Sequence, residues 1–201
     1  MTPPRPHDLL RLPGASALGT DAPDWATAAL SATPWVVVRR GTAQRGRLAV
    51  GVRGASRSQR WATDINPEDV GEVLSPEELA HRTGARDLPA LAALDTARPL
   101  LDDAGLRWGP TGSVGFELAT GAPTTTRHSD LDLLVRLPRG TQLARLTELY
   151  RRLHALAVRV DCQVDTAAGA LALGELVAEQ PDVLVRTPEG PRLVPHEHAL
   201  A

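Results

Sequence analysis

Hydrophobic positions in the first part of the chain form short runs separated by glycine, proline and polar residues. Residues 35–39 (WVVVR) and 47–53 (RLAVGVR) have the composition typical of β-strands, with a polar, glycine-containing loop between them. We expect them to form an antiparallel pair. Ser75-Pro76-Glu77-Glu78 then combines an N-cap serine, a proline at the first helical position and acids in the first turn, which predicts a helix start. The pattern predicts a small, strand-rich N-terminal subdomain over residues 1–82.

The second part of the chain alternates between helix and strand patterns. Leu88, Leu91 and Leu94 recur at helical spacing, and Pro99 is expected to kink or divide that helix. Further helices are expected at about 114–119, 143–156 and 171–178, and strands at 106–108, 129–137, 158–165, 183–186 and 191–194. This order predicts a second domain over residues 83–201 and an α/β (α+β) fold.

Composition narrows the class of protein. The 201 residues carry a formal net charge of −2, and all 22 basic residues are arginine. Balanced charge and few aromatic residues argue against a nucleic-acid-binding role. The sequence contains neither a signal-peptide pattern nor an apolar run near the roughly 20 residues that span a bilayer, so no membrane association is expected. Cys162 is the single cysteine and cannot form an internal disulfide, which favours a cytoplasmic protein.

The segment 129–137 (SDLDLLVRL) carries the clearest chemical signal, two aspartates separated by one leucine. Alternate side chains of a strand point to opposite faces, so Asp130 and Asp132 share one face while Leu131 and Leu133 share the other. Two neighbouring carboxylates repel each other unless cations bind them. A pair of divalent metal ions about 3.5–4 Å apart would remove this repulsion and clamp the attacking and leaving oxygens of an in-line displacement. The pattern predicts metal-dependent phosphoryl or nucleotidyl transfer.

Two further sets of residues complete this candidate site. Gly112 lets the backbone approach a phosphate closely, the helix that follows points free N–H groups at it, and Ser113 adds a hydroxyl donor. A third carboxylate is expected where two metal ions are held. We favour Asp161, which lies within its strand, but Asp165 near the end of the same strand remains an alternative. Cys162 is expected to be a buried, inert thiol.

The residues at these positions resemble the signature of the nucleotidyltransferase superfamily, which includes DNA polymerase beta. The matching pieces are Gly112-Ser113, Asp130-Leu131-Asp132 and Val160-Asp161-Cys162. More narrowly, nearly the whole chain resembles the malonate decarboxylase holo-acyl-carrier-protein synthases, also called phosphoribosyl-dephospho-CoA transferases. The segments that carry this resemblance are RPHDLLRL, WVVVRR, VGVRGASRSQR, TGSVGFELATG, SDLDLLVR, DCQVDT and TPEGPRLV.

The resemblance implies a nucleotidyltransferase-type mixed sheet in the C-terminal half and a specific reaction. A 2'-(5''-phosphoribosyl)-3'-dephospho-CoA group would pass from its triphosphate precursor, triphosphoribosyl-dephospho-CoA, to a serine of the apo acyl carrier protein subunit of malonate decarboxylase, and pyrophosphate would leave. Asp130, Asp132 and Asp161 match the metal-binding carboxylates, and Gly112 and Ser113 match the phosphate-holding turn. The implied cofactor is Mg²⁺, as two ions.

Three arginines of the first part form a second group of candidates. Arg53, Arg57 and Arg60 lie together in VRGASRSQR. A guanidinium is a rigid, bidentate fork, so these residues could bind the leaving diphosphate or the CoA phosphates. They could instead steer an acidic carrier protein, or form a solvated basic face. With the resemblance, residues 1–82 are interpreted as a substrate- or carrier-binding subdomain.

Two alternative functions stay open from the sequence. A stand-alone adenylyltransferase that acts on a protein or small molecule would use the same glycine, serine and aspartates. A non-catalytic module that binds the carrier protein would need a defective metal site, whereas the expected carboxylates are present.

Overall fold

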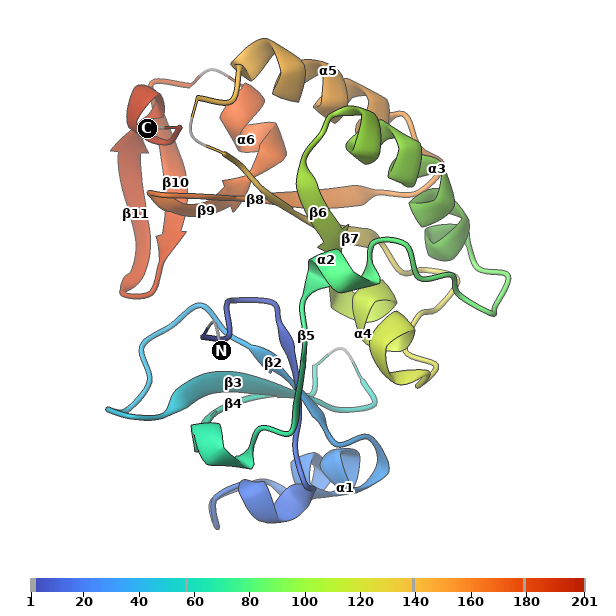
Figure 1. Ribbon diagram of the computed structural model, residues 1–201, viewed down its shortest axis with the longest axis vertical. Helices are drawn as coiled ribbons and strands as arrows, with labels where there is room; N and C mark the ends of the chain where they lie inside the picture. Colours follow the sequence, from blue (N-terminus) through green and yellow to red (C-terminus); the bar gives the residue numbers. More distant parts are fainter. Residues whose placement is uncertain (1–2, 57, 139, 179, 201) are drawn as a thin grey trace. The chain divides into compact units, whose positions relative to one another are not determined.

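The computed structural model describes residues 3–56, 58–138, 140–178 and 180–200. The chain divides into two compact units, Met1–Ser75 and Pro76–Ala201, each with its own sheet (Figure 1). The predicted α+β class is confirmed, because both sheets are accompanied by helices. Among the described helices, none is long and apolar enough to cross a lipid bilayer.

The first unit is built on an antiparallel sheet with strand order β4-β3-β2-β1-β5. The strands are β1 (Leu9–Arg11), β2 (Trp35–Val38), β3 (Leu48–Arg53), β4 (Arg60–Ile65) and β5 (Glu72–Leu74). The expected antiparallel pair is confirmed, since Val37 of β2 lies opposite Gly51 of β3. Short 3-10 turns cover Ala15–Ala17 and Pro67–Asp69.

One helix of this unit was not foreseen from the hydrophobic pattern. Helix α1 (Asp24–Ala32) packs its Ala26 and Leu30 into the core beside Val36. An alanine-rich helix that buries few large side chains gives a weak periodic signal, because alanine contributes little apolar area.

The second unit contains a mixed sheet with strand order β11-β10-β9-β8-β7-β6. Its strands are β6 (Arg107–Pro110), β7 (Leu131–Arg136), β8 (Val160–Thr166), β9 (Gly169–Ala172), β10 (Asp182–Thr187) and β11 (Gly190–Pro195). Strands β7 and β8 are parallel, and the other neighbouring pairs are antiparallel. The connection between the two parallel strands runs through a helix, as a parallel crossover requires.

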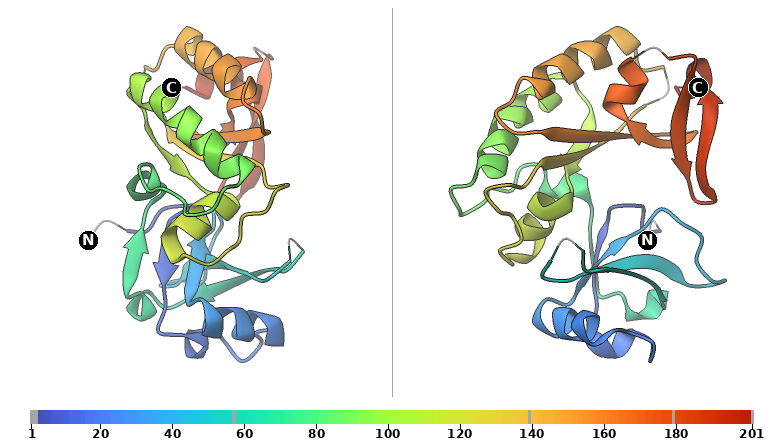
Figure 2. Two further views of the ribbon diagram at one scale, coloured as in Figure 1. Left: turned by 90° about the vertical axis from the view of Figure 1, so that its right-hand side faces the viewer. Right: turned by 180° about the vertical axis from the view of Figure 1, so that it is seen from behind.

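The helices of the second unit lie around this sheet. They are α2 (Pro76–Leu79), α3 (Pro89–Asp103), α4 (Gly112–Thr120), α5 (Leu143–His154) and α6 (Leu173–Val177), with a 3-10 turn at His196–His198. Figures 1 and 2 show α3 and α5 along the same side of the sheet. Their leucines form one core with the apolar side chains that β7 and β8 direct to that side, such as Leu133 and Val164. Helix α3 runs through Pro99, so the proline does not divide it.

Helix α2 marks the start of the second unit. A Cβ atom at Gly109 of β6 would lie 1.8 Å from the carbonyl oxygen of Pro76, so this glycine allows α2 to pack directly on the strand. The division therefore falls after Ser75, whereas the sequence pattern placed it after residue 82.

Near the end of the chain, the observed helix is shorter than the one expected at 171–178. Residues 169–172 form β9 instead, and α6 begins at Leu173. The periodicity of a short apolar run such as GALALGELV fits a strand and a helix equally well. The pairing of Ala170 with Asp165 of β8 makes the first part of this run a strand.

Candidate active site

The predicted aspartate strand is β7. Leu131, Leu133 and Val135 are buried in the core under the helices, and Asp132, on the other face, is partly exposed. Asp130 is the residue before β7 and is also partly exposed. The backbone N–H of Leu131 donates a hydrogen bond of 2.9 Å to the carbonyl of Arg159, which holds the beginnings of β7 and β8 together.

Strand β8 brings Asp161 beside Asp132. The two residues are partners in the parallel register, and register partners on neighbouring strands share a face. The next residue, Cys162, points into the core, where burial, followed by the charge of Asp161, raises the pKa of its thiol to about 12. The thiol is therefore uncharged and unreactive at neutral pH, as the sequence pattern predicts.

Gly112 is packed directly against Asp132. It has a positive φ of 58° at the start of α4, and a Cβ atom there would lie 1.8 Å from Oδ2 of Asp132. The N–H of Thr111 also donates to the carbonyl oxygen of Asp132 over 2.9 Å. Any larger residue at position 112 would displace the carboxylate, so the glycine-serine turn and the aspartate strand form one structural unit.

Asp165 has a different environment from Asp161. Its Oδ2 accepts a hydrogen bond of 2.8 Å from Nη1 of Arg136, and Nε of Arg136 donates to Oε1 of Glu77 over 2.7 Å. The Arg136 side chain is only 10% exposed. The structure thus commits Asp165 to a buried ion pair, whereas the Asp161 side chain is 56% exposed and has Arg159 at 3.7 Å.

Together, the structure brings Gly112, Asp132 and Asp161 to one place, with Asp130 at the end of the same strand. In the ranges that the structure describes, no three histidine, cysteine, aspartate or glutamate side chains come close enough to hold a metal ion by themselves. Magnesium is commonly held by one or two carboxylates together with water and substrate phosphates, so this set of oxygen donors fits it.

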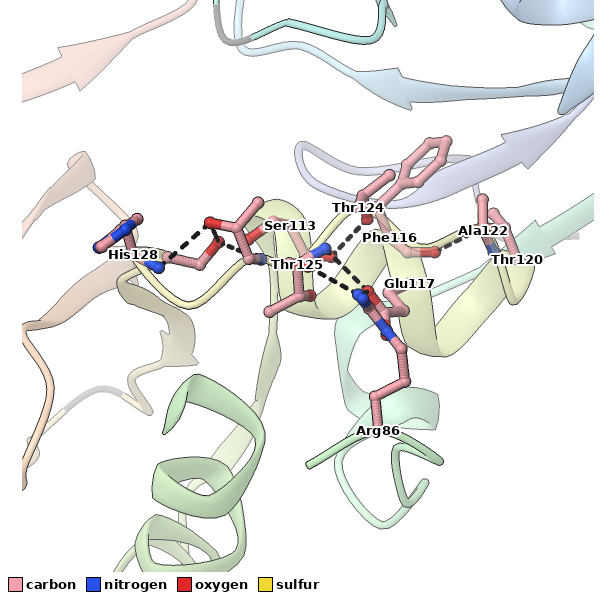
Figure 3. A network of polar contacts seen from close by, with 11 residues as sticks. Arg86, Ser113, Phe116, Glu117, Thr120, Ala122, Thr124, Thr125 and His128 are labelled. Carbon is pink, nitrogen blue, oxygen red and sulfur yellow. Dashed lines mark hydrogen bonds and ion pairs between the residues drawn. The ribbon is translucent and has the colours of Figure 1, made fainter. Parts of the chain in front are cut away.

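A network of polar contacts that the sequence did not reveal fixes the segment leading to β7 (Figure 3). Arg86 binds both carboxylate oxygens of Glu117 on α4, with Nε–Oε1 at 2.9 Å and Nη2–Oε2 at 2.6 Å. Nη2 of Arg86 also donates to the carbonyl of Thr125 over 2.6 Å, and the N–H of Thr125 donates to Oε2 of Glu117 over 2.8 Å. The hydroxyl of Thr124 donates to the carbonyl of Ser113 over 2.9 Å. We call Arg86, Glu117 and Thr125 the loop clamp.

Charge in the loop clamp is well compensated. Glu117 is only 7% exposed, and burial alone would raise the pKa of its carboxyl. The hydrogen bonds from Arg86 and Thr125 outweigh this effect, so the pKa lies below its usual value and the group stays ionised. The sequence feature that could have indicated a buried, paired carboxylate is the single glutamate within the apolar helix segment GSVGFELAT.

Two of the three candidate arginines lie together in the first unit. Arg53 of β3 and Arg60 of β4 are direct cross-strand partners. The guanidinium of Arg60 also donates to the carbonyl of Gln59 over 3.1 Å. Arg57 lies outside the described residues.

Comparison with known proteins places the chain in a family. Residues 5–76 match the model of the phosphoribosyl-dephospho-CoA transferase MdcG N-terminal domain, and residues 78–197 match that of the MdcG C-terminal domain. The chain belongs to the phosphoribosyl-dephospho-CoA transferase family. The two matched ranges meet close to the division between the structural units.

Relatives of that name are similar over almost their whole length. The protein of Pseudomonas putida is 45% identical over 194 residues, which cover 96% of this chain and 95% of the relative. Those of Pseudomonas aeruginosa and Azotobacter vinelandii are 43% and 41% identical, each over 95% of this chain and 92% of the relative. No solved structure matches the chain. The family resemblance is confirmed, and the protein is a transferase enzyme.

Proposed function

We propose that this enzyme transfers the 2'-(5''-phosphoribosyl)-3'-dephospho-CoA group from triphosphoribosyl-dephospho-CoA to a serine of the apo acyl carrier protein subunit of malonate decarboxylase. Full-length similarity to phosphoribosyl-dephospho-CoA transferases supports the donor. The structural observation that carries the proposal is the packing of Gly112 against Asp132, with Asp161 in register beside it. The proposed compartment is the cytoplasm, in keeping with a lone, buried thiol.

The proposed reaction is an in-line displacement at phosphorus. The serine oxygen of the carrier forms a bond to the phosphorus nearest the ribose, and the hydroxyl proton passes to solvent water. The bond from that phosphorus to the oxygen bridging to the diphosphate breaks, and pyrophosphate leaves. Little covalent chemistry is asked of the protein, so its contribution is positioning and charge compensation.

Each residue of the site has a proposed task in this reaction. Asp130, Asp132 and Asp161 are the residues that would hold Mg²⁺, expected as two ions, together with phosphate oxygens of the substrate. When bound, the ions neutralise charge on the phosphates and polarise the reacting phosphorus. Gly112 lets the phosphates approach the first turn of α4, whose N–H groups and Ser113 hydroxyl are donors for them.

The arginines of the first unit are proposed to bind phosphate groups of the donor. Arg53 and Arg60 are cross-strand partners, so their two guanidinium groups come from neighbouring strands and are rigid, bidentate donors suited to phosphate oxygens. Arg57 is proposed for the same task from its place in the sequence.

The proposal is tested by following prosthetic-group transfer to the carrier serine and pyrophosphate release. We expect Asp130→Asn and Asp132→Asn to lower the transfer rate by about a hundredfold or more, because each removes a carboxylate charge from the metal site. Asp182→Asn is the matched control, since Asp182 is exposed on β10 of the same sheet. Near-normal transfer by a folded Asp132→Asn variant would contradict the site assignment.

The same assay shows whether the enzyme uses triphosphoribosyl-dephospho-CoA or ATP as its substrate. With labelled ATP in place of triphosphoribosyl-dephospho-CoA, we expect no label on the carrier protein or on other acceptors. Transfer of adenylate from ATP, with no transfer from the proposed donor, would show that the enzyme is an adenylyltransferase.

A further inference from the structure

A cavity of about 600 Å³ lies in the second unit beside the beginning of β8. Its wall is formed by the end of α5, residues 156–159 of the connection that follows, residues 160–162 of β8, the last residue of β9 and the start of α6. Its volume is within the range of roughly 300–1,000 Å³ that is usual for small-molecule sites. None of the tasks proposed above uses it, except that Asp161 is one of its lining residues.

The cavity exists because β9 is shorter than β8. Ala172, the last residue of β9, lies opposite Gln163, and the chain then turns into α6. In the described strands, Val160 and the two residues after it therefore have no ladder partner on the β9 side. Backbone N–H and C=O groups of a strand edge can form hydrogen bonds with the polar edge of a ligand.

Aromatic and apolar side chains line the cavity. Tyr150 and His154 of α5 meet edge to face, with ring centroids 5.5 Å apart. Gly174 lies against the Tyr150 ring, and a Cβ atom there would be 3.0 Å from Cε2 of Tyr150, so the glycine leaves room beside the ring. Leu153 and Leu173, both buried, complete the apolar wall.

The charged residues of the cavity are Arg159 and Asp161, which lie at the beginning of β8. Asp161 is the register partner of Asp132, so the cavity adjoins the face that carries the proposed transfer chemistry. An aromatic, mainly apolar wall, a strand edge with hydrogen-bonding groups and a neighbouring guanidinium together suit a flat heteroaromatic ring attached to an anionic group.

We propose that this cavity binds the adenine ring of the dephospho-CoA part of the donor, an inference that rests on the proposed function. The base lies against Tyr150, its polar edge faces the backbone of Val160–Cys162, and Arg159 meets a phosphate of the same nucleotide. The ring is thereby anchored next to Asp161, and the rest of the donor extends from it along the Asp132 face.

The test is the affinity of the full-length protein for AMP and for dephospho-CoA, measured by titration calorimetry. Ala157→Trp places a large side chain at the cavity, because Ala157 is an exposed lining residue. Ala155→Trp is the matched control, since Ala155 is exposed on the same connection and does not line the cavity. We expect Ala157→Trp to weaken both ligands by roughly tenfold to a hundredfold, the range for losing one base-stacking contact, and Ala155→Trp to leave both unchanged.

A second readout follows the strand edge directly. Amide hydrogen exchange at Val160–Cys162 should slow when AMP binds to the wild-type protein, and not when AMP is added to Ala157→Trp. Phosphopantetheine, which contains no adenine, should give no protection. If phosphopantetheine protects this edge and AMP does not, the cavity holds the pantetheine arm and the adenine assignment is wrong.

Failure of the cavity proposal is distinguishable from failure of the proposed function. Unchanged AMP binding and donor transfer in a folded Ala157→Trp variant would overturn the cavity proposal alone. A second outcome has two parts: the wild-type enzyme transfers nothing from the proposed donor, and Ala157→Trp loses AMP binding. The first part would overturn the proposed function, and the second would still support an adenine site in the cavity. A wild-type protein that binds neither AMP nor dephospho-CoA would overturn the cavity proposal.

Discussion

Strands β7 and β8 place acidic side chains on the same face at two levels, and the surroundings of the two differ. Near the beginning of the strands, Asp132 and Asp161 lie side by side, with Gly112 packed on Asp132. Four positions further on, Asp165 lies beside Arg136 and forms an ion pair with it. At the first level both aspartates are partly or largely exposed, whereas at the second level Asp165 is paired with the poorly exposed Arg136. Acidic side chains on one face of the sheet therefore have different surroundings at the two levels.

The largest expected effect comes from removing the ion pairs of Arg136, which lies at the end of β7. Arg136→Ala removes the guanidinium that Glu77 and Asp165 share at a place where the Arg136 side chain is only 10% exposed, although Glu77 keeps Arg107 at 3.5 Å. We expect the free energy of unfolding to fall by about 3–5 kcal/mol. Arg151→Ala is the control, because its ion pair with Glu148 is exposed and should change stability by less than about 1 kcal/mol. Urea unfolding of both variants measures the difference, and equal values would contradict the structural role of Arg136.

At the other end of the strands, Gly112→Ala should abolish most activity. The new Cβ would meet the carboxylate of Asp132, and a displacement of about 1 Å at a reacting centre can lower the rate by about a hundredfold. Gly121→Ala is a close control: Gly121 also has a positive φ, of 74°, but nothing lies within 4 Å of its Cβ position.

Both glycine variants should lose similar stability, about 1–2 kcal/mol, from the unfavourable backbone conformation. Transfer assays and thermal unfolding separate the two effects. Equal loss of activity in both variants would show that backbone strain, and not contact with Asp132, explains the requirement for glycine.

A smaller effect is expected at the loop clamp. Glu117→Gln keeps the shape of the side chain but removes the charge that Arg86 and Thr125 bind, at a cost of about 1.5–3 kcal/mol for a hydrogen-bonded charge. The segment before Asp130 should then move more freely, and transfer should fall roughly tenfold. Glu148→Gln is the control, because the ion pair between Glu148 and Arg151 is exposed. Wild-type transfer by Glu117→Gln would mean that the clamp stabilises the fold without positioning the site.

The smallest effect is a dependence of stability on pH. The pKa of Glu117 is lower in the folded protein than its usual value of 4.5, so its ionised form stabilises the fold above that pH. This contribution is lost as the pH falls through the folded-state pKa, below 4.5. In urea titrations, the stability difference between wild type and Glu117→Gln should therefore be greatest at neutral pH and shrink as the pH falls below 4.5. A difference that stays constant over this range would contradict the shift.

Local patterns are sufficient to nominate candidate site residues that lie on one strand or in one turn. Asp130 and Asp132 followed from alternation along β7, and Gly112 from its place before a helix. The loop clamp could not be predicted in this way, because Arg86 and Glu117 are joined only by the fold. The different surroundings of Asp161 and Asp165 could not be predicted either, because they depend on a distant residue, Arg136, which lies opposite Asp165 through the pairing of β7 with β8.

Contacts between distant residues also account for two differences between the expected and the observed elements. The run 169–177 is apolar enough for either a strand or a helix, and the available edge of β8 determined that it begins as a strand. Helix α2 was interpreted as part of the first domain because its start signals are local, whereas its packing on β6 through Gly109 is not.

Asp161 is proposed to bind metal and Asp165 to stabilise the fold, and a comparison of Asp161→Asn with Asp165→Asn tests this difference directly. The measurement is the rate of pyrophosphate release per folded molecule, with triphosphoribosyl-dephospho-CoA and the apo carrier protein as substrates. We predict that Asp161→Asn unfolds like the wild type and loses about a hundredfold or more in rate. Asp165→Asn should unfold more easily yet keep a rate within about threefold of the wild type. The reverse result, an active Asp161→Asn and an inactive but stable Asp165→Asn, would contradict the assignment.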